Sequence, residues 1–412
     1  MNDWKKLDLT AVDKQSKDDE EFLKKRVVGQ DRAIKRVVES LMLFRTPFKQ
    51  PDKPVGAFLW LGPTGSGKTR LAEAIAERFY YDRDALVRID CSVLNEAHLL
   101  SSLTGTSHGY IGYDDDYKLS QKSISAPAYE ILDNNKELKA LWQDADVKAR
   151  KFNSIANDGK TPPDEIEKLA EETEEAWLKY NLRCVKELSK RPLVILFDEV
   201  ERAHPDLFNL LISILNRASL AMANGEKTDF STALIVMTSN IGAEDIERLR
   251  KRIGFAPPPP MEKEDDEIYH VVMLKVREII GGPLAGRLGD NITVFHSLKP
   301  EHLRTILDNQ ISELNEVFQK WFAISVTEEV RTFIFESAHH HENGARIIED
   351  KIKKYIRIPL SSLWVTSQLQ NKEAIEVYLE NDEICVKARE GLILKDAIVN
   401  VKVIKARKPP AE

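Results

Sequence analysis

Short, uninterrupted apolar runs are the clearest pattern in the first 240 residues of the chain. They cover residues 55–61, 86–89, 193–197 and 233–237. Runs of this length are typical of parallel strands that are buried on both faces. Stretches with helical spacing lie between them, for example over 33–43, where apolar residues recur every three or four positions. The alternation predicts an α/β fold with a doubly wound parallel sheet.

One segment breaks this alternation. Residues 120–190 are rich in charge and poor in strand signals, and Pro162-Pro163-Asp164-Glu165 has the composition of a helix start. We expect an inserted helical arm here. Its apolar positions fit two interpretations, an ordinary amphipathic helix with a solvated face or an arm that docks a partner.

The last part of the chain has a different pattern. Helical spacing returns over 301–322 and 345–363, and three alternating segments follow at 374–379, 384–388 and 397–404. They predict a small helical subdomain that closes with a short C-terminal sheet. We therefore expect three parts: a flexible N-terminal segment (1–25), a large α/β subdomain (26–297) and a small helical subdomain (298–412).

Composition narrows the class of protein. The 412 residues carry a formal net charge of -7, and nucleic-acid-binding domains usually show a basic patch instead. The three cysteines, Cys91, Cys184 and Cys385, are far apart, which favours a reducing compartment. The N-terminus has no apolar core of signal-peptide length, and no run approaches the ~20 apolar residues of a membrane span. We expect a cytoplasmic protein with no nucleic-acid or membrane partner.

A phosphate-binding motif follows the first apolar run. It reads Gly62-Pro63-Thr64-Gly65-Ser66-Gly67-Lys68-Thr69 and matches G-x-x-x-x-G-K-[ST] between a predicted strand and a predicted helix. The glycines let backbone N–H groups surround phosphates at a helix N-terminus. Lys68 would neutralise the phosphates, and the Thr69 hydroxyl would hold Mg²⁺. The alternative is a chance match in a glycine-rich turn. The motif predicts that ATP and Mg²⁺ bind here.

Two adjacent acids end the third apolar run. A strand this apolar would not end in Asp198-Glu199 without a cation nearby. Asp198 is predicted to hold Mg²⁺, and Glu199 to orient and deprotonate the attacking water. Asn240 follows the fourth run, where its amide can bond the γ-phosphate or the water; a simple turn asparagine is the alternative.

These residues together resemble a known family. Val28-Gly29-Gln30, the phosphate loop, the run from Phe197 to Pro205 and Met237-Thr238-Ser239-Asn240 stand in the order of a Clp-type AAA+ unfoldase. The resemblance is to the second ATPase domain of ClpA, ClpB and ClpC, and it extends over residues 26–363 apart from the arm. It implies an AAA+ P-loop ATPase that forms a ring, as a homo-hexamer or a spiral.

The resemblance also implies roles that spacing alone does not. Tyr110 and Ile111 match an axial pore loop that grips extended polypeptide, although a Tyr/Gly loop by itself is more often a turn. Arg346 resembles the sensor-2 arginine and Arg287 the arginine finger that acts on the neighbouring subunit's ATP. Val27 and Val28 would line the adenine pocket.

The chain departs from the family in three places. The segment before Arg287 lacks the family's Phe-Arg-Pro-Glu-Phe-like run, which leaves the register of the finger open. Residues 216–227 have the length of the family's second pore loop but not its sequence. The arm has no counterpart in those domains. Ile253-Gly254-Phe255 resembles the tripeptide that docks a ClpP-type peptidase; alternatively, its side chains pack on the core.

The sequence therefore favours an ATP-hydrolysing, ring-forming motor that threads protein substrates through a pore as an unfoldase, disaggregase or chaperone. The alternative is an ATP-gated scaffold or assembly switch that does not translocate substrate. A nucleic-acid motor would need the basic surface that the composition does not provide.

Overall fold

The computed structural model of the chain describes residues 12–105, 117–156, 161–243, 261–319, 321–338, 344–369, 374–381, 383–389 and 399–405. The chain divides into two units. The first contains residues 1–23, 32–62 and 68–294, and the second contains 24–31, 63–67 and 295–412. Within the described ranges, no helix combines the length and the apolar character that a membrane span requires.

The first unit is built around a five-stranded sheet in the order β2-β3-β6-β1-β7, and every neighbouring pair is parallel. The strands are β1 (Gly56–Leu61), β2 (Val87–Asp90), β3 (Leu193–Asp198), β6 (Ala233–Ser239) and β7 (Ile292–Val294). β3 and β6 are almost completely buried along their length, which explains their uninterrupted apolar runs. The predicted doubly wound parallel sheet is confirmed, and β7 is a strand that the sequence patterns did not predict.

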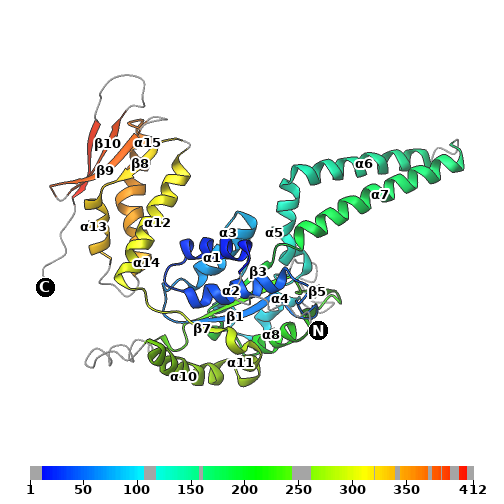
Figure 1. The fold of residues 1–412 in the computed structure, drawn as a ribbon, viewed down its shortest axis with the longest axis horizontal. Helices are drawn as coiled ribbons and strands as arrows, with labels where there is room; N and C mark the ends of the chain where they lie inside the picture. Colours follow the sequence, from blue (N-terminus) through cyan, green and yellow to red (C-terminus); the bar gives the residue numbers. More distant parts are fainter. Residues whose placement is uncertain are drawn as a thin grey trace, which may run out of the picture. The chain divides into compact units, whose positions relative to one another are not determined.

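Helices cover both faces of this sheet. Figure 1 draws α1 (Lys14–Arg26), α2 (Asp31–Phe44) and α3 (Lys68–Tyr80) on one side, and α8 (Asp206–Arg217), α10 (Met261–Ile279) and α11 (Gly282–Leu288) on the other. The largest fully buried side chains include Phe58, Trp60, Phe197 and Phe230. Phe58, Trp60 and Phe197 belong to strands, so the core of the unit is centred on the sheet.

Short elements complete the first unit. They comprise the 3₁₀ turns η1 (Cys91–Val93), η2 (Ala97–Leu100), η3 (Val200–Arg202) and η4 (Gly289–Asn291), the short helix α4 (Ser101–Thr104), and an antiparallel hairpin of β4 (Ser219–Ala221) and β5 (Lys227–Asp229).

The predicted arm consists of three helices, α5 (Gln121–Asn134), α6 (Lys136–Ala156) and α7 (Pro163–Leu188). α6 and α7 run side by side as a long hairpin that projects from the rest of the first unit (Figure 1). Leu138 and Ala145 of α6, and Leu169 and Ala176 of α7, are buried. The hairpin thus has an apolar seam of its own.

The second unit joins helices to a small sheet. Its helices are α12 (Pro300–Phe318), α13 (Glu328–Glu336), α14 (Gly344–Ile352), the π-helical turn η5 (Lys353–Arg357) and α15 (Ile358–Val365). The sheet has the order β11-β10-β9-β8, with β8 (Ala323–Val326), β9 (Ala374–Glu380), β10 (Glu383–Arg389) and β11 (Val399–Lys405). The predicted helical subdomain with a short C-terminal sheet is confirmed. β8 adds a fourth strand, parallel to β9.

Helix α1 starts earlier than the sequence suggested. Its first residue is Lys14, whereas we expected a flexible segment over residues 1–25. The helix is anchored to the first unit by a buried carboxylate. Asp19 is 1% exposed and forms ion pairs with Arg45, directly after α2, and, at 2.7 Å, with Arg78 of α3. A buried carboxylate between two arginines ties α1 to the end of α2 and to α3.

Asp19→Ala should lower the free energy of unfolding of the protein by about 3–5 kcal/mol, because it leaves two guanidinium groups without their buried partner. Urea denaturation followed by circular dichroism measures the change. Asp31→Ala is the matched control, because the Asp31 side chain is 70% exposed in its 3.0 Å pair with Lys24. That pair should contribute at most about 1 kcal/mol. Equal losses from the two variants would contradict a special role for Asp19.

Candidate nucleotide site

The register of the parallel sheet gathers polar side chains at one edge. Asp90 of β2 lies opposite Asp198 of β3, and Phe197 lies opposite Met237 of β6, so Thr238 follows next to Asp198. Because the carboxyl ends of parallel strands share one edge, residues far apart in the sequence meet here. This is the edge at which open α/β sheets bind their ligands.

The phosphate loop connects β1 to α3 with a backbone that only glycine adopts easily. Gly62, Gly65 and Gly67 have φ angles of 135°, 77° and 99°, in the region that a Cβ disfavours. The loop leads into the N-terminus of α3, a 13-residue helix. Backbone N–H groups at such a terminus favour phosphate oxygens.

Lys68 is 8% exposed and lies between two oxygen atoms of the first unit. Its ammonium group donates to the carbonyl oxygen of Gly62 at 2.6 Å and to Asn240 Oδ1 at 3.0 Å. The structure therefore brings Asn240 next to the lysine of the loop. The Asn240 backbone N–H donates to Glu201 Oε1 at 3.0 Å, which holds this strand end against the turn that follows β3.

Residues 63–67 of the phosphate loop belong to the second unit. Val27 and Gln30 of the same unit lie next to them. Val27 is buried, and its Cγ1 lies 3.3 Å from the position that a Cβ on Gly67 would take. Gln30 Nε2 donates to the carbonyl oxygens of Ser66 and His296, both at 3.0 Å. Gln30 thereby ties the phosphate loop to the segment that precedes α12. Val28, the second predicted adenine-pocket residue, is half-buried.

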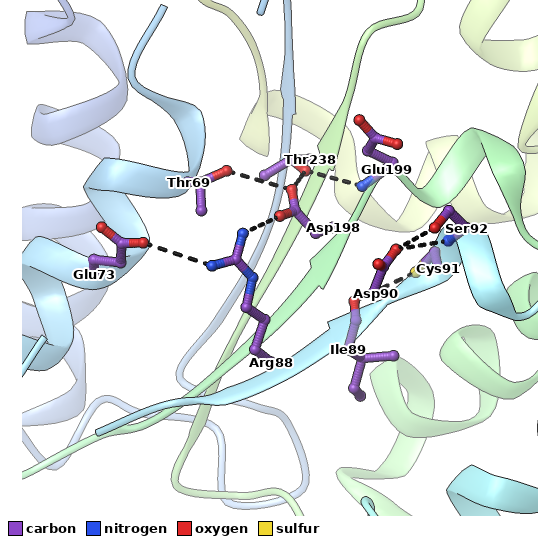
Figure 2. A network of polar contacts seen from close by, with 10 residues as sticks. All are labelled: Thr69, Glu73, Arg88, Ile89, Asp90, Cys91, Ser92, Asp198, Glu199 and Thr238. Carbon is purple, nitrogen blue, oxygen red and sulfur yellow. Dashed lines mark hydrogen bonds and ion pairs between the residues drawn. The ribbon is translucent and has the colours of Figure 1, made fainter. Parts of the chain in front are cut away.

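Asp198 is the centre of the polar network that Figure 2 shows. Its Oδ1 accepts hydrogen bonds from the Thr238 hydroxyl and, at 3.3 Å, from the Thr69 hydroxyl. Its Oδ2 pairs with a guanidinium nitrogen of Arg88 at 2.7 Å. Three elements, α3, β6 and β2, thus fix this carboxylate.

Arg88 also lies near Glu73 of α3, with 3.7 Å between Nη1 and Oε1. Burial raises the pKa of the Glu73 carboxyl, and the positive charges of Arg70, Arg88 and Arg83 oppose that shift. Figure 2 shows the guanidinium of Arg88 lying between Glu73 and Asp198. The arginine therefore has two acidic neighbours on the two sides of the site.

Glu199 occupies a strained position directly after β3. Its φ angle is 57°, in the left-handed region that non-glycine residues rarely adopt. Its N–H donates to the Thr238 hydroxyl at 3.1 Å, so this one hydroxyl bonds both acids of the pair. The Glu199 carboxylate is 33% exposed and pairs with Arg202 at 3.0 Å. Figure 2 shows that the Glu199 side chain points away from Asp198.

Two groups near β2 are not reactive candidates. Burial raises the pKa of the Cys91 thiol well above its usual range, and the nearby carboxylates of Asp198, Asp90 and Glu201 add to the effect. A buried, protonated thiol is inert. Hydrogen bonds from the Ser92 hydroxyl and N–H lower the pKa of Asp90, which caps η1.

The oxygen atoms of Thr69 and Asp198 suit a hard cation. A hydroxyl and a carboxylate oxygen lie 3.3 Å apart beside the start of α3, and Mg²⁺ in phosphate sites commonly takes one or two such ligands together with phosphates and waters. Within the described ranges, no group of three or more His, Cys, Asp or Glu side chains is arranged to hold a metal. A magnesium ion that arrives with a nucleotide fits this donor set; an all-protein metal cage does not.

The two predicted arginines lie in different units. Arg287 is exposed on α11, and its guanidinium donates to Asn216 Oδ1 at 2.7 Å and to the Pro283 carbonyl at 2.9 Å. Arg346 is exposed on α14 of the second unit. Neither hydrogen bond of Arg287 involves the phosphate-loop residues, which is compatible with an action outside its own site.

Tyr110, Ile111 and the tripeptide Ile253-Gly254-Phe255 lie outside the described residues, so their roles stay predictions. The flanks of the first loop are described. α4 ends at Thr104, and Ala223 of the β4–β5 turn donates its N–H to the Thr104 carbonyl at 2.9 Å. At the base of the arm, Gln121 Oε1 accepts from the Asp229 N–H at 2.8 Å. The flank of the predicted pore loop, the hairpin of residues 219–229 and the arm are thus hydrogen-bonded in series.

Sequence reasoning overlooked four residues of this site. They are Arg88, Thr238, Glu201 and Gln30, which contact Asp198, Glu199, Asn240 and Ser66. Thr238 and Gln30 stand inside quoted motifs, so their position next to assigned residues was the available signal. Arg88 is a polar residue on a short strand, and nothing in its spacing points to Asp198, 110 residues later.

Two family models match the chain. An AAA domain model (Cdc48 subfamily) matches residues 53–132 and 184–291, and a model of the C-terminal D2-small domain of ClpB matches residues 298–377. The first match stops across residues 133–183, which hold α6 and most of α7. The α6–α7 hairpin is therefore an insertion relative to that model. Almost all of α5 lies inside the match, so the expectation that the whole segment 120–190 has no counterpart is wrong at both ends.

Curated relatives and solved structures agree with these models. ClpC, the ATP-binding subunit of an ATP-dependent Clp protease of Staphylococcus saprophyticus, is 30% identical over 376 residues, which are 90% of this chain and 38% of the relative. The chaperone ClpB of Oceanobacillus iheyensis is 29% identical over 363 residues, covering 88% of this chain and 37% of ClpB. The structure of the S. cerevisiae Hsp104:casein complex aligns with a TM-score of 0.64 at 25% identity, over 90% of this chain and 52% of that one. The chain thus spans well under half of the curated relatives' length.

Thr238→Val should destabilise the protein by about 1–3 kcal/mol, because it removes one donor from buried Asp198 and the acceptor of the Glu199 N–H while keeping the side-chain volume. Thermal or urea denaturation measures the loss. Thr238→Ser keeps the hydroxyl and is the control, with an expected loss below that of valine. If the valine variant were as stable as the unmodified protein, or more stable than the serine variant, the bridging hydroxyl would not contribute to stability.

Proposed function

We propose, because the chain belongs to the Clp-type AAA+ family, that it hydrolyses ATP and uses the energy to remodel protein substrates. The observation that carries this proposal is the cluster around Asp198, in which the phosphate-loop threonine, the strand-end acids and Asn240 converge on one edge of the sheet. The relatives that match are an ATP-binding subunit of a protease and a chaperone.

In this proposal the residues of one subunit divide the chemistry among them. The N–H groups of the loop and the ammonium of Lys68 bind the phosphates, with Val27 and Val28 at the adenine. Thr69 and Asp198 would hold Mg²⁺, which when bound would neutralise charge at the phosphates. The Glu199 carboxylate accepts a proton from the attacking water, and the Asn240 amide orients that water or the γ-phosphate. Arg346 would supply a positive charge to the γ-phosphate, as its resemblance to the sensor-2 arginine implies.

Arg287 acts on the ATP of a neighbouring copy in this proposal. Its exposure on α11 supports such a role, because an arginine finger must extend from the surface of its own subunit to reach the neighbour. A positive charge supplied by the neighbour makes hydrolysis depend on assembly of a ring or spiral, as a homo-oligomer. The proposed hexamer rests on the family and not on a contact within the structure.

Protein substrate would pass Tyr110 and Ile111. An aromatic side chain gives broad apolar contact with a polar tip, which suits grip on many sequences. The hydrogen bond between Thr104 and Ala223 places the base of this loop beside the β4–β5 hairpin, and Gln121 adds the base of the arm. In the proposal the arm therefore stands at the site where substrate engages, and the complex of Hsp104 with casein is the structural analogue.

Glu199→Gln should bind ATP as the unmodified protein does, while its rate of hydrolysis falls by a factor of about 10²–10⁴, the usual contribution of a positioned base. The amide keeps the shape of the side chain but cannot accept the proton. A phosphate-release assay measures hydrolysis, and fluorescent-nucleotide titration measures binding. Unchanged turnover would show that another group acts on the water.

The same variant tests the trans arrangement. Arg287→Ala subunits keep a complete site but lack the finger, whereas Glu199→Gln subunits keep the finger. Mixing the two should restore hydrolysis above the sum of the separate samples, because mixed interfaces unite both groups. No recovery on mixing would exclude Arg287 as a finger acting between subunits.

Tyr110→Ala should leave ATP hydrolysis intact and abolish the unfolding of a tagged fluorescent protein. The physical reason is that the phosphate site does not need the aromatic grip, whereas pulling on polypeptide does. Tyr110→Phe keeps the ring and is the control, and it should retain most of the unfolding rate. If Tyr110→Ala unfolded substrate at the normal rate, the threading mechanism would be excluded.

A further inference from the structure

Arg88 occupies a cation's place at the centre of the site. Its Nη2 lies 2.7 Å from Asp198 Oδ2, while the hydroxyls of Thr69 and Thr238 bond the other oxygen. The Asp198 side chain is 18% exposed. The guanidinium thus supplies the positive charge that a carboxylate at the end of a buried strand requires.

A second cation at Asp198 must compete with this guanidinium. Under the proposed function, Asp198 and Thr69 hold Mg²⁺, a dication that demands close oxygen ligands. The guanidinium of Arg88 is a permanent positive charge. Two positive charges on one carboxylate repel each other, so binding of the metal favours a shift of the guanidinium away from Asp198.

Glu73 is the neighbour that can receive it. Its Oε1 lies 3.7 Å from Arg88 Nη1, beyond hydrogen-bonding distance but close enough for an ion pair. The Arg88 side chain is 53% exposed, so its movement displaces solvent and few packed neighbours, whereas the Glu73 side chain is only 22% exposed. A small movement would exchange a tight pair with Asp198 for a tight pair with Glu73.

We propose that Arg88 is a positioning residue that holds Asp198 in the absence of metal and passes to Glu73 when Mg²⁺ binds with nucleotide. This rests on the proposed nucleotide and metal site. The exchange makes the affinity for metal depend on two side chains that do not touch the metal. It also keeps the Asp198 carboxylate in the same position after one nucleotide has left and before the next one binds.

The test compares nucleotide binding with and without metal. The dissociation constant of a fluorescent ATP analogue is measured in EDTA and in excess Mg²⁺. The value in EDTA divided by the value in Mg²⁺ gives the metal dependence of binding. Arg88→Gln should raise this ratio by about 3–10-fold, as expected for the loss of a charge-assisted contact at a half-exposed group. Without the guanidinium, Asp198 repels the triphosphate in EDTA, and nothing competes with the metal.

Glu73→Gln should change the ratio in the opposite direction, by a factor of about 2–5, because Arg88 loses the partner that receives it. The double variant should behave as Arg88→Gln does, since Glu73 acts only through the arginine. Arg88→Lys keeps the charge and should stay nearer to the unmodified protein. Arg150→Gln on the arm, where Arg150 pairs with Asp146, is the control for net charge and should leave the ratio unchanged.

The outcomes separate this inference from the proposed function. If the unmodified protein binds no nucleotide, or binds it equally with and without Mg²⁺, the proposed site fails and the inference fails with it. If Mg²⁺ tightens binding and the ratio is the same in Arg88→Gln, or falls, only the inference is overturned. Independent shifts from Glu73→Gln and Arg88→Gln that add in the double variant would also overturn it. Circular dichroism confirms folding, and Glu73→Gln tests the exchange even if Arg88→Gln does not fold.

Discussion

The carboxylate of Asp198 sets the main constraint on the first unit. A strand as buried as β3 can end in a charge only if neighbouring elements satisfy it. Thr69 of α3, Thr238 of β6 and Arg88 of β2 do so together. Their bonds connect the helix that follows the phosphate loop to three strands of the sheet. The same set of bonds fixes the side chains that the proposed function assigns to phosphate and metal, so fold stability and site geometry have one physical origin.

The arm does not disturb the site at the edge of the sheet, because its two long helices pack against each other. Leu138 and Ala145 pack in the seam with Leu169 and Ala176, and Arg183 pairs with Glu137 across the hairpin at 2.8 Å. A self-packed hairpin needs only a firm base, which α5 provides against β3 and β5. The break in the family match at residues 133–183 coincides with this hairpin. An insertion of this kind can therefore add a surface without changing the sheet.

The sequence predicted the features that depend on local pattern. Uninterrupted apolar runs predicted the buried strands. The phosphate loop and the Asp198-Glu199 pair could be found because their residues follow recognisable motifs. It did not predict β7, because three residues are too few for a pattern, or the start of α1, whose buried positions Ser16, Asp19 and Leu23 include two polar residues. Arg88 illustrates the general reason. Its role depends on the pairing of β2 with β3, and strand order is a property of the tertiary fold.

The two adjacent acids are restrained to different degrees, and the difference matches the work proposed for them. Asp198 receives two hydroxyls and a guanidinium and is largely buried. Among the residues that the structure describes, the Glu199 carboxylate pairs with Arg202, and the two side chains are 33% and 60% exposed. Exposed pairs of this kind contribute little, at most about 1 kcal/mol, so the Glu199 side chain can turn while its backbone stays fixed by Thr238. A metal ligand must keep its place between turnovers, whereas a base must reach a water that arrives with each nucleotide. The sheet edge satisfies both needs, because one threonine hydroxyl holds the carboxylate of the first acid and only the backbone of the second.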